Sequence, residues 1–255
     1  MNDLFSLAFL NQFEWPVIIL ICIFTLITSA IHGATGVAGG FLLSAALALI
    51  IGVKPIVPII SVALLVSHAT RGLLNFRDFD KLVFLHISLA AIPFIIIVAI
   101  IYGKMSSTMI SIFLGIVILS SIPLRHLAKN REIKIGRFGL SIVGTIYGGL
   151  SGASVGPGML LVPFMLGYGL SKEAFVATLA CSALVTNIVR VSVFGSMDLL
   201  MGGYFMLGIL IGLVTIPGNW IGRVILRKMS LQKHNGFVDL LSILGALNFF
   251  WLAIR

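Results

Sequence analysis

Long apolar runs separated by short polar segments recur from Trp15 to the end of the chain. Many of them are close to about 20 residues long, the length that a helix needs to cross about 30 Å of hydrocarbon. The pattern therefore predicts an all-α integral membrane protein with about eight to ten helical segments. We expect these segments at about 15–31, 41–52, 55–76, 82–102, 107–124, 138–147, 158–169, 173–194, 199–227 and 236–254.

The composition agrees with a membrane protein that has no soluble domain. Hydrophobic residues make up 59% of the 255 residues, charged residues make up 10%, and the mean hydropathy is +1.17. No stretch between the apolar runs is long enough for a soluble fold, so we interpret 1–255 as a single transmembrane domain. The first apolar run follows Asp3 and Glu14 rather than basic residues, which predicts a retained helix and not a secretory signal.

The chain carries an internal repeat. The segment "GATGVAGGFLLS" (33–44) is similar to "GLSGASVGPGMLLVP" (149–163), and the apolar segments that follow these two motifs also match. Further matched features lie about 116 to 124 residues apart and in the same order: Arg71 with Arg190, Asp80 with Asp198, and the "KMS" triplets that follow Pro93 and Pro217. The repeats cover about 13–127 and 137–255, and the basic segment 125–137 joins them.

The distribution of lysine and arginine indicates how the repeats are oriented. Basic residues concentrate in the segments 125–137 and 223–233, and the positive-inside rule places both on the cytoplasmic side. Both can lie there only if each glycine-broken segment enters the membrane and returns, so that each repeat crosses an odd number of times. The second repeat is then inverted relative to the first. If each broken segment crossed the membrane once, the repeats would be parallel instead.

The two glycine-rich motifs are expected to interrupt membrane helices at matching positions. Non-helical backbone at membrane depth is tolerated only where protein or a wet cavity covers it, and paired interruptions in inverted repeats mark a binding site. Helices that restart at Phe41 and Met159 would point free N–H groups and the positive end of the helix dipole at that cavity, which suits an anion. The predicted substrate-binding glycines and serines are Gly36, Gly39, Gly40, Ser151, Gly152, Ser154, Gly156 and Gly158.

Close helix packing is the alternative explanation for these glycines. Several pairs have the GxxxG spacing that is typical of tightly packed membrane helices: Gly36/Gly40, Gly144/Gly148, Gly148/Gly152, Gly208/Gly212 and Gly218/Gly222. For the pairs between 208 and 222 we favour close packing. For the two matched motifs, where glycine, serine and proline cluster, we favour a break that lines a cavity.

The duplicated motif, the long apolar segment after each copy and the loops "FRDFD" and "GSMD" resemble the TauE/SafE family of sulfite exporters, also described as sulfonate-uptake permeases. The resemblance covers nearly the whole chain. The segment "GGLSGASVGPGMLLVP" (148–163) is similar to the family's glycine-rich pattern, with Pro157 in place of one glycine. In the first copy, Ser44 and Ala45 stand where the family usually has proline. The resemblance implies a multi-pass protein of the cytoplasmic (inner) membrane that transports a small sulfur-containing or organic anion, such as sulfite or a sulfonate.

Ionisable residues inside apolar runs cost about 3 kcal/mol on insertion scales and are therefore functional candidates. Arg190 lies toward the external end of its predicted helix, where we expect it to face an anion pathway; snorkelling or capping of a helix end is the alternative. Its repeat mate Arg71 lies toward the cytoplasmic end. Asn187 and His68 each precede one of these arginines by three residues, so they share its helix face and could donate hydrogen bonds to a substrate. Hydrogen bonding between helices is the alternative role.

Three further groups of residues have simpler expected roles. His32, just before the first glycine motif, is a candidate to carry a coupling proton, because an unperturbed histidine titrates at about pH 6.5; a helix-end role is the alternative. Asp80 and Asp198 lie in loops at the ends of long segments, where we expect helix caps rather than ion ligands. Cys22 and Cys181 are isolated within apolar runs, which indicates packing.

These observations favour a secondary transporter that moves a small anion by alternating access, with a passive anion channel as the alternative. The chain has no GxxxxGK[ST] motif, so coupling to a H+ or Na+ gradient is the simplest drive. We do not expect an enzyme, because the five histidines lack metal-ligand spacing and no carboxylate pair lies inside an apolar run. We also expect no cofactor, no metal and no nucleic-acid partner. Lipid surrounds the protein, and a homo-oligomer is compatible with the sequence.

Overall fold

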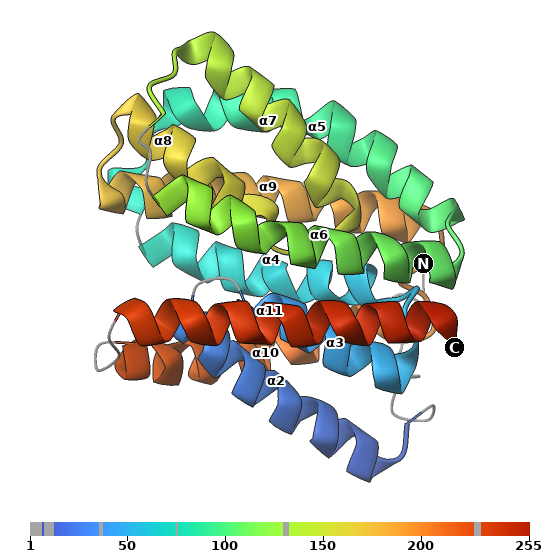
Figure 1. Ribbon diagram of the computed structural model, residues 1–255. Coiled ribbons are helices and arrows are strands. Elements are labelled where there is room, and N and C mark those ends of the chain that lie inside the picture. Colours follow the sequence, from blue (N-terminus) through green and yellow to red (C-terminus); the bar gives the residue numbers. More distant parts are fainter. Residues whose placement is uncertain (1–6, 8–12, 36–37, 75, 130–132, 227–230) are drawn as a thin grey trace.

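The computed structural model describes residues 7, 13–35, 38–74, 76–129, 133–226 and 231–255. Within these ranges the chain forms helices and no strands, which confirms the predicted all-α class (Figure 1). The elements are α2 (Trp15–Thr35), α3 (Ala38–Ile51), α4 (Ile56–Leu74), η1 (Phe76–Asp78), α5 (Lys81–Lys104), α6 (Ser107–Lys129), α7 (Arg137–Ala153), η2 (Pro157–Leu161), α8 (Val162–Tyr168), α9 (Lys172–Ser196), α10 (Tyr204–Leu226) and α11 (Leu231–Ile254).

The surface of the helix bundle is suited to lipid. Of the described residues, Lys81–Lys104, Glu173–Ser196 and Tyr204–Ile221 form helices long and apolar enough to cross a membrane. Large apolar side chains remain exposed on the outer faces, for example Leu89 at 63% and Ile97 at 52% on α5. Water would solvate such a surface poorly, whereas lipid tails solvate it well. The structure therefore agrees with a membrane protein.

The helices run between two ends of the molecule (Figure 1). We name the end between α6 and α7 the linker end, and the end where α2 begins and α11 ends the terminal end. The helix α2 runs inward from the terminal end and α3 returns to it, whereas α7 runs inward from the linker end and η2 with α8 returns there. Gly167 in α8 lies so close to the backbone of Ile133, just before α7, that a Cβ atom would be 2.6 Å from its carbonyl carbon. The beginning and end of this second hairpin therefore lie side by side.

The glycine-rich breaks are shorter than the sequence predicts. The expectation that helices restart at Phe41 and Met159 is wrong, because α3 begins at Ala38 and η2 begins at Pro157. In the second motif α7 continues through both glycines at 148 and 149 to Ala153, so only 154–156 separate it from η2. Glycine lowers helix propensity by about 1 kcal/mol, but packing against a neighbouring helix outweighs that cost here.

The glycines of α7 pack against the backbone of α5. A Cβ atom on Gly144 would lie 2.9 Å from the Cα of Ile87, and one on Gly148 would lie 2.7 Å from the Cα of Ala91. Glycine is required at such positions because the two backbones approach within the space that any side chain would fill. The GxxxG pair at 144 and 148 therefore serves close packing, the alternative explanation of the sequence.

The glycines of α10 have the same role. Gly208 and Gly212 lie against α4, where Cβ atoms would approach the side chains of Val62 and Val66 to 2.6 Å and 2.9 Å. Gly218 lies against α2, close to Ser29. These contacts confirm the prediction of close packing for the described glycines between 208 and 222.

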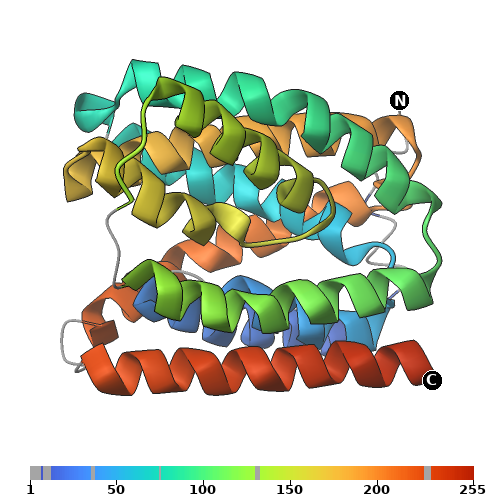
Figure 2. The same ribbon diagram turned by 45° about the horizontal axis from the view of Figure 1, so that its top comes forward.

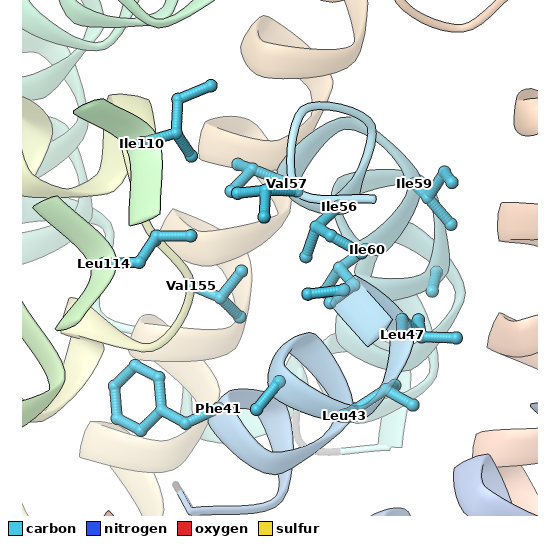
Figure 3. Packing of buried hydrophobic residues seen from close by; sticks show 14 of the residues in the cluster. Phe41, Leu43, Leu47, Ile56, Val57, Ile59, Ile60, Ile110, Leu114 and Val155 are labelled. Atoms are coloured by element: carbon cyan, nitrogen blue, oxygen red, sulfur yellow. The ribbon is translucent and has the colours of Figure 1, made fainter. Parts of the chain in front are cut away.

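Buried apolar residues form two clusters that each combine helices from both halves of the chain. One cluster joins α5, α7, η2 and α8, and the other joins α2, α3, α4, α6, α10 and α11 with the last turns of α5 and α9. Figure 2 shows α5 with α7, α8 and α9 on one side of the molecule, and α6 and α11 on the other. Val155, in the break after α7, belongs to the second cluster and lies among the side chains of Phe41, Ile60 and Leu114 (Figure 3). The tip of one hairpin therefore contacts the other half of the chain.

Of the two predicted helix caps, one is confirmed. Asp80 is the N-cap of α5, and its Oδ1 accepts a hydrogen bond of 2.9 Å from the backbone N–H of Val83. The backbone N–H of Asp80 donates to Thr178 Oγ1 at 3.0 Å, which ties this turn to α9. Asp198 follows the C-cap residue Met197 of α9 and has φ of 60°, so it occupies a left-handed turn rather than a helix N-cap.

Candidate functional site

A cavity of about 280 Å³ lies where the two hairpins approach each other. Its wall combines α2, α3, α4 and α10 with α7, the break after α7, η2, α8 and α9. The polar side chains of the wall belong to Thr28, Ser29, Ser67, His68, Tyr147, Ser151, Ser154, Thr186, Asn187, Arg190, Thr215 and Asn219. No aspartate or glutamate is among the described residues that line it, and Arg190 is the one side chain there with a permanent charge.

Most of the described residues predicted for the site lie together at this cavity. They are Gly40, His68, Ser151, Ser154, Gly156, Gly158, Asn187 and Arg190. The prediction that Gly152 binds substrate is wrong, because Gly152 faces α5. A Cβ atom on Gly152 would lie 2.7 Å from Val98 Cβ and 3.0 Å from the carbonyl oxygen of Ile95. Gly39 lies in the first turn of α3, Gly36 lies outside the described residues, and the side chains of Arg71 and His32 lie outside the described part of the structure.

Arg190 caps the inner end of α7. Its side chain projects from α9 and is only 2% exposed. One guanidinium nitrogen, Nη1, donates to the carbonyl oxygens of Ser151 at 2.8 Å and Ser154 at 2.6 Å. The last carbonyls of a helix have no partner within it and carry the negative end of the helix dipole, so a cation there is stabilised. Arg190 therefore caps a helix end, one of the two roles that the sequence left open, and the residue also lines the cavity.

The second guanidinium nitrogen of Arg190 is held by Asn187. Arg190 Nη2 donates to Asn187 Oδ1, and Asn187 Nδ2 donates to the carbonyl oxygen of Ala183 at 2.7 Å. These bonds use Oδ1 and one N–H of the Asn187 amide, which is 2% exposed. Asn187 therefore orients Arg190, a role that the sequence did not predict, and it also lines the cavity.

Oδ1 of Asn219, an acceptor, is buried in the described cavity wall without a hydrogen-bond partner, and two donors there also lack one. The donors are Nε of Arg190 and Oγ of Ser151, and Ser151 is 1% exposed. Both belong to residues of the cavity wall. A buried charge or donor without a partner is unfavourable, so these groups favour a ligand with negatively charged oxygens. The cavity wall thus combines a positive charge with unused donors and has no competing carboxylate among its described residues.

Sequence reasoning missed Tyr147, Thr28 and Thr215, whose side chains also belong to the wall. The hydroxyl of Tyr147 lies 3.2 Å from Thr186 Oγ1, which itself donates to the carbonyl oxygen of Ser182 at 2.9 Å. Tyr147 precedes Ser151 by four residues and thus shares its helix face, a signal that could have identified it. Thr28 on α2 and Thr215 on α10 lie far from the glycine motifs in sequence, and only the fold brings them to the cavity.

Backbone conformation explains why glycine stands in the break. Gly156 has φ of +95°, which residues with a side chain rarely adopt. A Cβ atom there would also lie 2.9 Å from Cζ of Phe41 at the start of α3. The adjacent Gly158 leaves room between η2 and α9, since its Cβ would be 3.3 Å from Leu179 Cδ1. The break therefore combines a turn and a close contact between the two hairpins.

The comparison with protein families gives one match that covers almost the whole chain. The family model "Sulfite exporter TauE/SafE" matches residues 7–249. No curated protein and no solved structure matches the chain. The match includes both hairpins and every residue of the cavity wall. The chain belongs to the TauE/SafE family of sulfite exporters.

Proposed function

We propose that this protein is a secondary transporter that moves sulfite, a sulfonate or a similar small anion across the cytoplasmic membrane. The observation that carries the proposal is the environment of Arg190, a buried cation beside a cavity with no carboxylate partner among the described residues. Leaving a buried charge uncompensated is costly, and a bound anion would compensate it. Membership of the TauE/SafE family supports the class of substrate.

We further propose that the halves 13–127 and 137–255 are inverted repeats within one multi-pass transmembrane domain. Each half has a hairpin followed by three long helices. Their contacts are reciprocal: α2 packs against α10 and α7 against α5, while α4 meets α9 and α6 meets α11. The first hairpin enters from the terminal end and the second from the linker end (Figure 1), which supports inversion. Rocking of the two halves would then expose the cavity alternately to each side.

The charge distribution supports an orientation with the linker end in the cytoplasm. Short loops and helix ends on the cytoplasmic side of a membrane protein are enriched in lysine and arginine. At the linker end the described chain carries Arg77, Lys81, Lys134, Arg137 and Lys172, whereas Lys54, Lys104 and Arg255 lie at the terminal end. The terminal end then faces outward from the cytoplasm.

The proposed binding site centres on the two unpartnered donors. Oxygens of the anion would bind Nε of Arg190 and Oγ of Ser151, near the break formed by Ser154, Gly156 and Gly158. The opposite wall supplies Gly40 and His68. Gly36, Gly39 and Arg71 stay in the proposal on repeat symmetry alone. His32 stays as the candidate for proton coupling to a H+ gradient because of its position before the first glycine motif, and Na+ is the other candidate ion.

The decisive experiment supplies Arg190 with the carboxylate that it lacks. Asn187→Asp has nearly the same shape as the native residue and keeps an oxygen beside Arg190 Nη2. The second carboxylate oxygen would replace the donor that faces the carbonyl oxygen of Ala183, so the melting temperature of the purified variant is measured first. We expect the folded variant to lose sulfite binding and flux, because the new carboxylate neutralises the guanidinium and repels the substrate. Binding is measured by calorimetry on detergent-purified protein, and flux is measured with radiolabelled sulfite in proteoliposomes.

Asn187→Ala is the matched control, because it removes the same hydrogen bond without adding a charge. We expect it to weaken sulfite binding by about tenfold, the usual effect of one hydrogen bond to a charged group. Sulfite binding of native strength in Asn187→Asp would refute a substrate site at Arg190. Counterflow of radiolabelled sulfite separates a transporter from a passive anion channel, since a channel would only dissipate the gradient.

A further inference from the structure

The cavity extends along α9 but stops at Arg190. Its wall on this helix begins at Phe175, close to the linker end, and continues along one face through Leu179, Ala183 and Asn187. Beyond Arg190, none of the described residues of α9 lines the cavity. On α4 the wall likewise ends at Ile60, and the preceding turn is fully buried. The cavity therefore reaches toward the linker end and is closed toward the terminal end.

Two aromatic residues fill the space beyond Arg190. Phe194 lies one turn after Arg190 on the same face of α9, and Tyr102 lies near the end of α5. Both side chains are fully buried, and their ring centroids are 5.5 Å apart. The Tyr102 hydroxyl donates to the carbonyl oxygen of Lys54 at 3.0 Å, in the turn between α3 and α4. One contact thus joins the ends of α5 and α9 to the first hairpin.

We infer that Tyr102 and Phe194, together with the carbonyl of Lys54, form the external gate of the transport pathway. The inference rests on the proposed transport function and on the orientation that places the terminal end outside the cytoplasm. In this arrangement the structure is the state that is open toward the cytoplasm, with the external gate closed. Substrate reaches Arg190 from the linker end and leaves past the two rings when they separate, or follows the opposite direction.

The position of Arg190 links substrate binding to the gate. Arg190 and Phe194 are one helical turn apart, and Arg190 is bonded to the break after α7 through Ser151 and Ser154. A substrate that draws the guanidinium away from these carbonyls would alter the contact between α9 and the second hairpin. Phe194 must follow any rotation or shift of α9, because it is carried by the same rigid turn. Opening of the gate then requires loss of the Tyr102 hydrogen bond to Lys54.

The test measures access to a single cysteine at the cavity wall. Ala183→Cys is introduced after the native cysteines are removed as Cys22→Ser and Cys181→Ser. A membrane-impermeant maleimide is applied to right-side-out and to inside-out vesicles. We expect labelling from the cytoplasmic face and slow labelling from the external face. Adding Tyr102→Phe should speed external labelling by about fivefold, the effect of losing one ordinary hydrogen bond, and Phe194→Ala should speed it further.

The control is Ile188→Ala, which lies on the same helix but is 50% exposed on the outer face. It should leave external labelling unchanged. The gate would be overturned if the Ala183→Cys protein were labelled equally fast from both faces. It would also be overturned if Tyr102→Phe did not speed external labelling while cytoplasmic labelling persisted. Tyr102→Phe keeps the ring, so it decides the question even if Phe194→Ala fails to fold. Labelling needs no substrate, so failure of the gate is distinguishable from failure of sulfite transport.

Discussion

Substitution of Gly148 by alanine tests how closely α7 must approach α5. The added Cβ would lie 2.7 Å from Cα and 2.9 Å from the carbonyl carbon of Ala91, whereas ordinary Cβ contacts begin near 3.4 Å. The carbonyl oxygen of Ala91 would lie closer still. The obstacle is backbone, so no side-chain rotation relieves it, and α7 must move by at least about 0.7 Å. Overpacking of this kind costs about 1–3 kcal/mol. We expect the melting temperature of the detergent-purified protein to fall by roughly 3–10 °C.

The same displacement should also affect the binding site. Ser151 lies three residues after Gly148, and its carbonyl oxygen accepts the 2.8 Å bond from Arg190. Any part of this shift that carries Ser151 away from α9 lengthens that contact, and about 0.7 Å would take it to about 3.5 Å, beyond a normal hydrogen bond. We therefore expect Gly148→Ala to reduce sulfite binding as well as stability, in calorimetric titrations at a temperature where the protein is folded.

Gly149→Ala is the matched control on the next residue of the same helix. No atom lies within 4 Å of the Cβ position at Gly149, so the methyl group meets open space. Alanine should raise helix stability here by about 1 kcal/mol relative to glycine. If Gly148→Ala and Gly149→Ala have the same melting temperature and bind sulfite equally, the argument that glycines 144 and 148 hold α7 against α5 is wrong.

Three further substitutions have defined outcomes. Gly156→Ala would place a side chain on a left-handed backbone and against the ring of Phe41. We expect it to lower the free energy of unfolding by roughly 2 kcal/mol or more in thermal unfolding; native stability would refute the requirement for glycine. Gly158→Leu should fill the cavity beside Leu179 and abolish sulfite flux in proteoliposomes while the protein remains folded by circular dichroism; native flux would exclude this part of the site. Asp80→Ala removes the N-cap of α5 and should lower the unfolding free energy by about 1 kcal/mol without changing sulfite affinity; a change in affinity at normal stability would show that Asp80 acts on substrate.

Local patterns predict the helices well because each helix satisfies its own backbone hydrogen bonds. The predicted segment 82–102 corresponds to α5, and 173–194 corresponds to α9, with differences of one or two residues at each end. Asp80 is recognisable as a cap from its position alone. The length of each glycine break, by contrast, cannot be predicted from the local sequence. Whether a glycine interrupts a helix or packs inside one depends on the neighbouring helix, which the sequence of α7 does not specify.

At the site, too, the sequence identified the charged residue but not its partners. Arg190 stands out in the sequence because a charge inside an apolar run needs a reason. Its partners could not be predicted, because the carbonyls of Ser151 and Ser154 lie more than one helix away and carbonyls are present in every residue. The role of Asn187 as a support for Arg190 likewise depends on side-chain geometry.

The sequence by itself determined that this chain is an all-α membrane protein with a repeated glycine motif and a buried arginine, because hydrophobic length, composition and repetition are properties of the chain alone. The tertiary structure decided which glycines bear on the cavity, that Gly152 faces α5, and that Tyr147 and Thr215 line the same wall as Arg190. The physical reason is that close approach, burial and unpaired donors are relations between helices. They exist only when segments that are distant in sequence pack against each other.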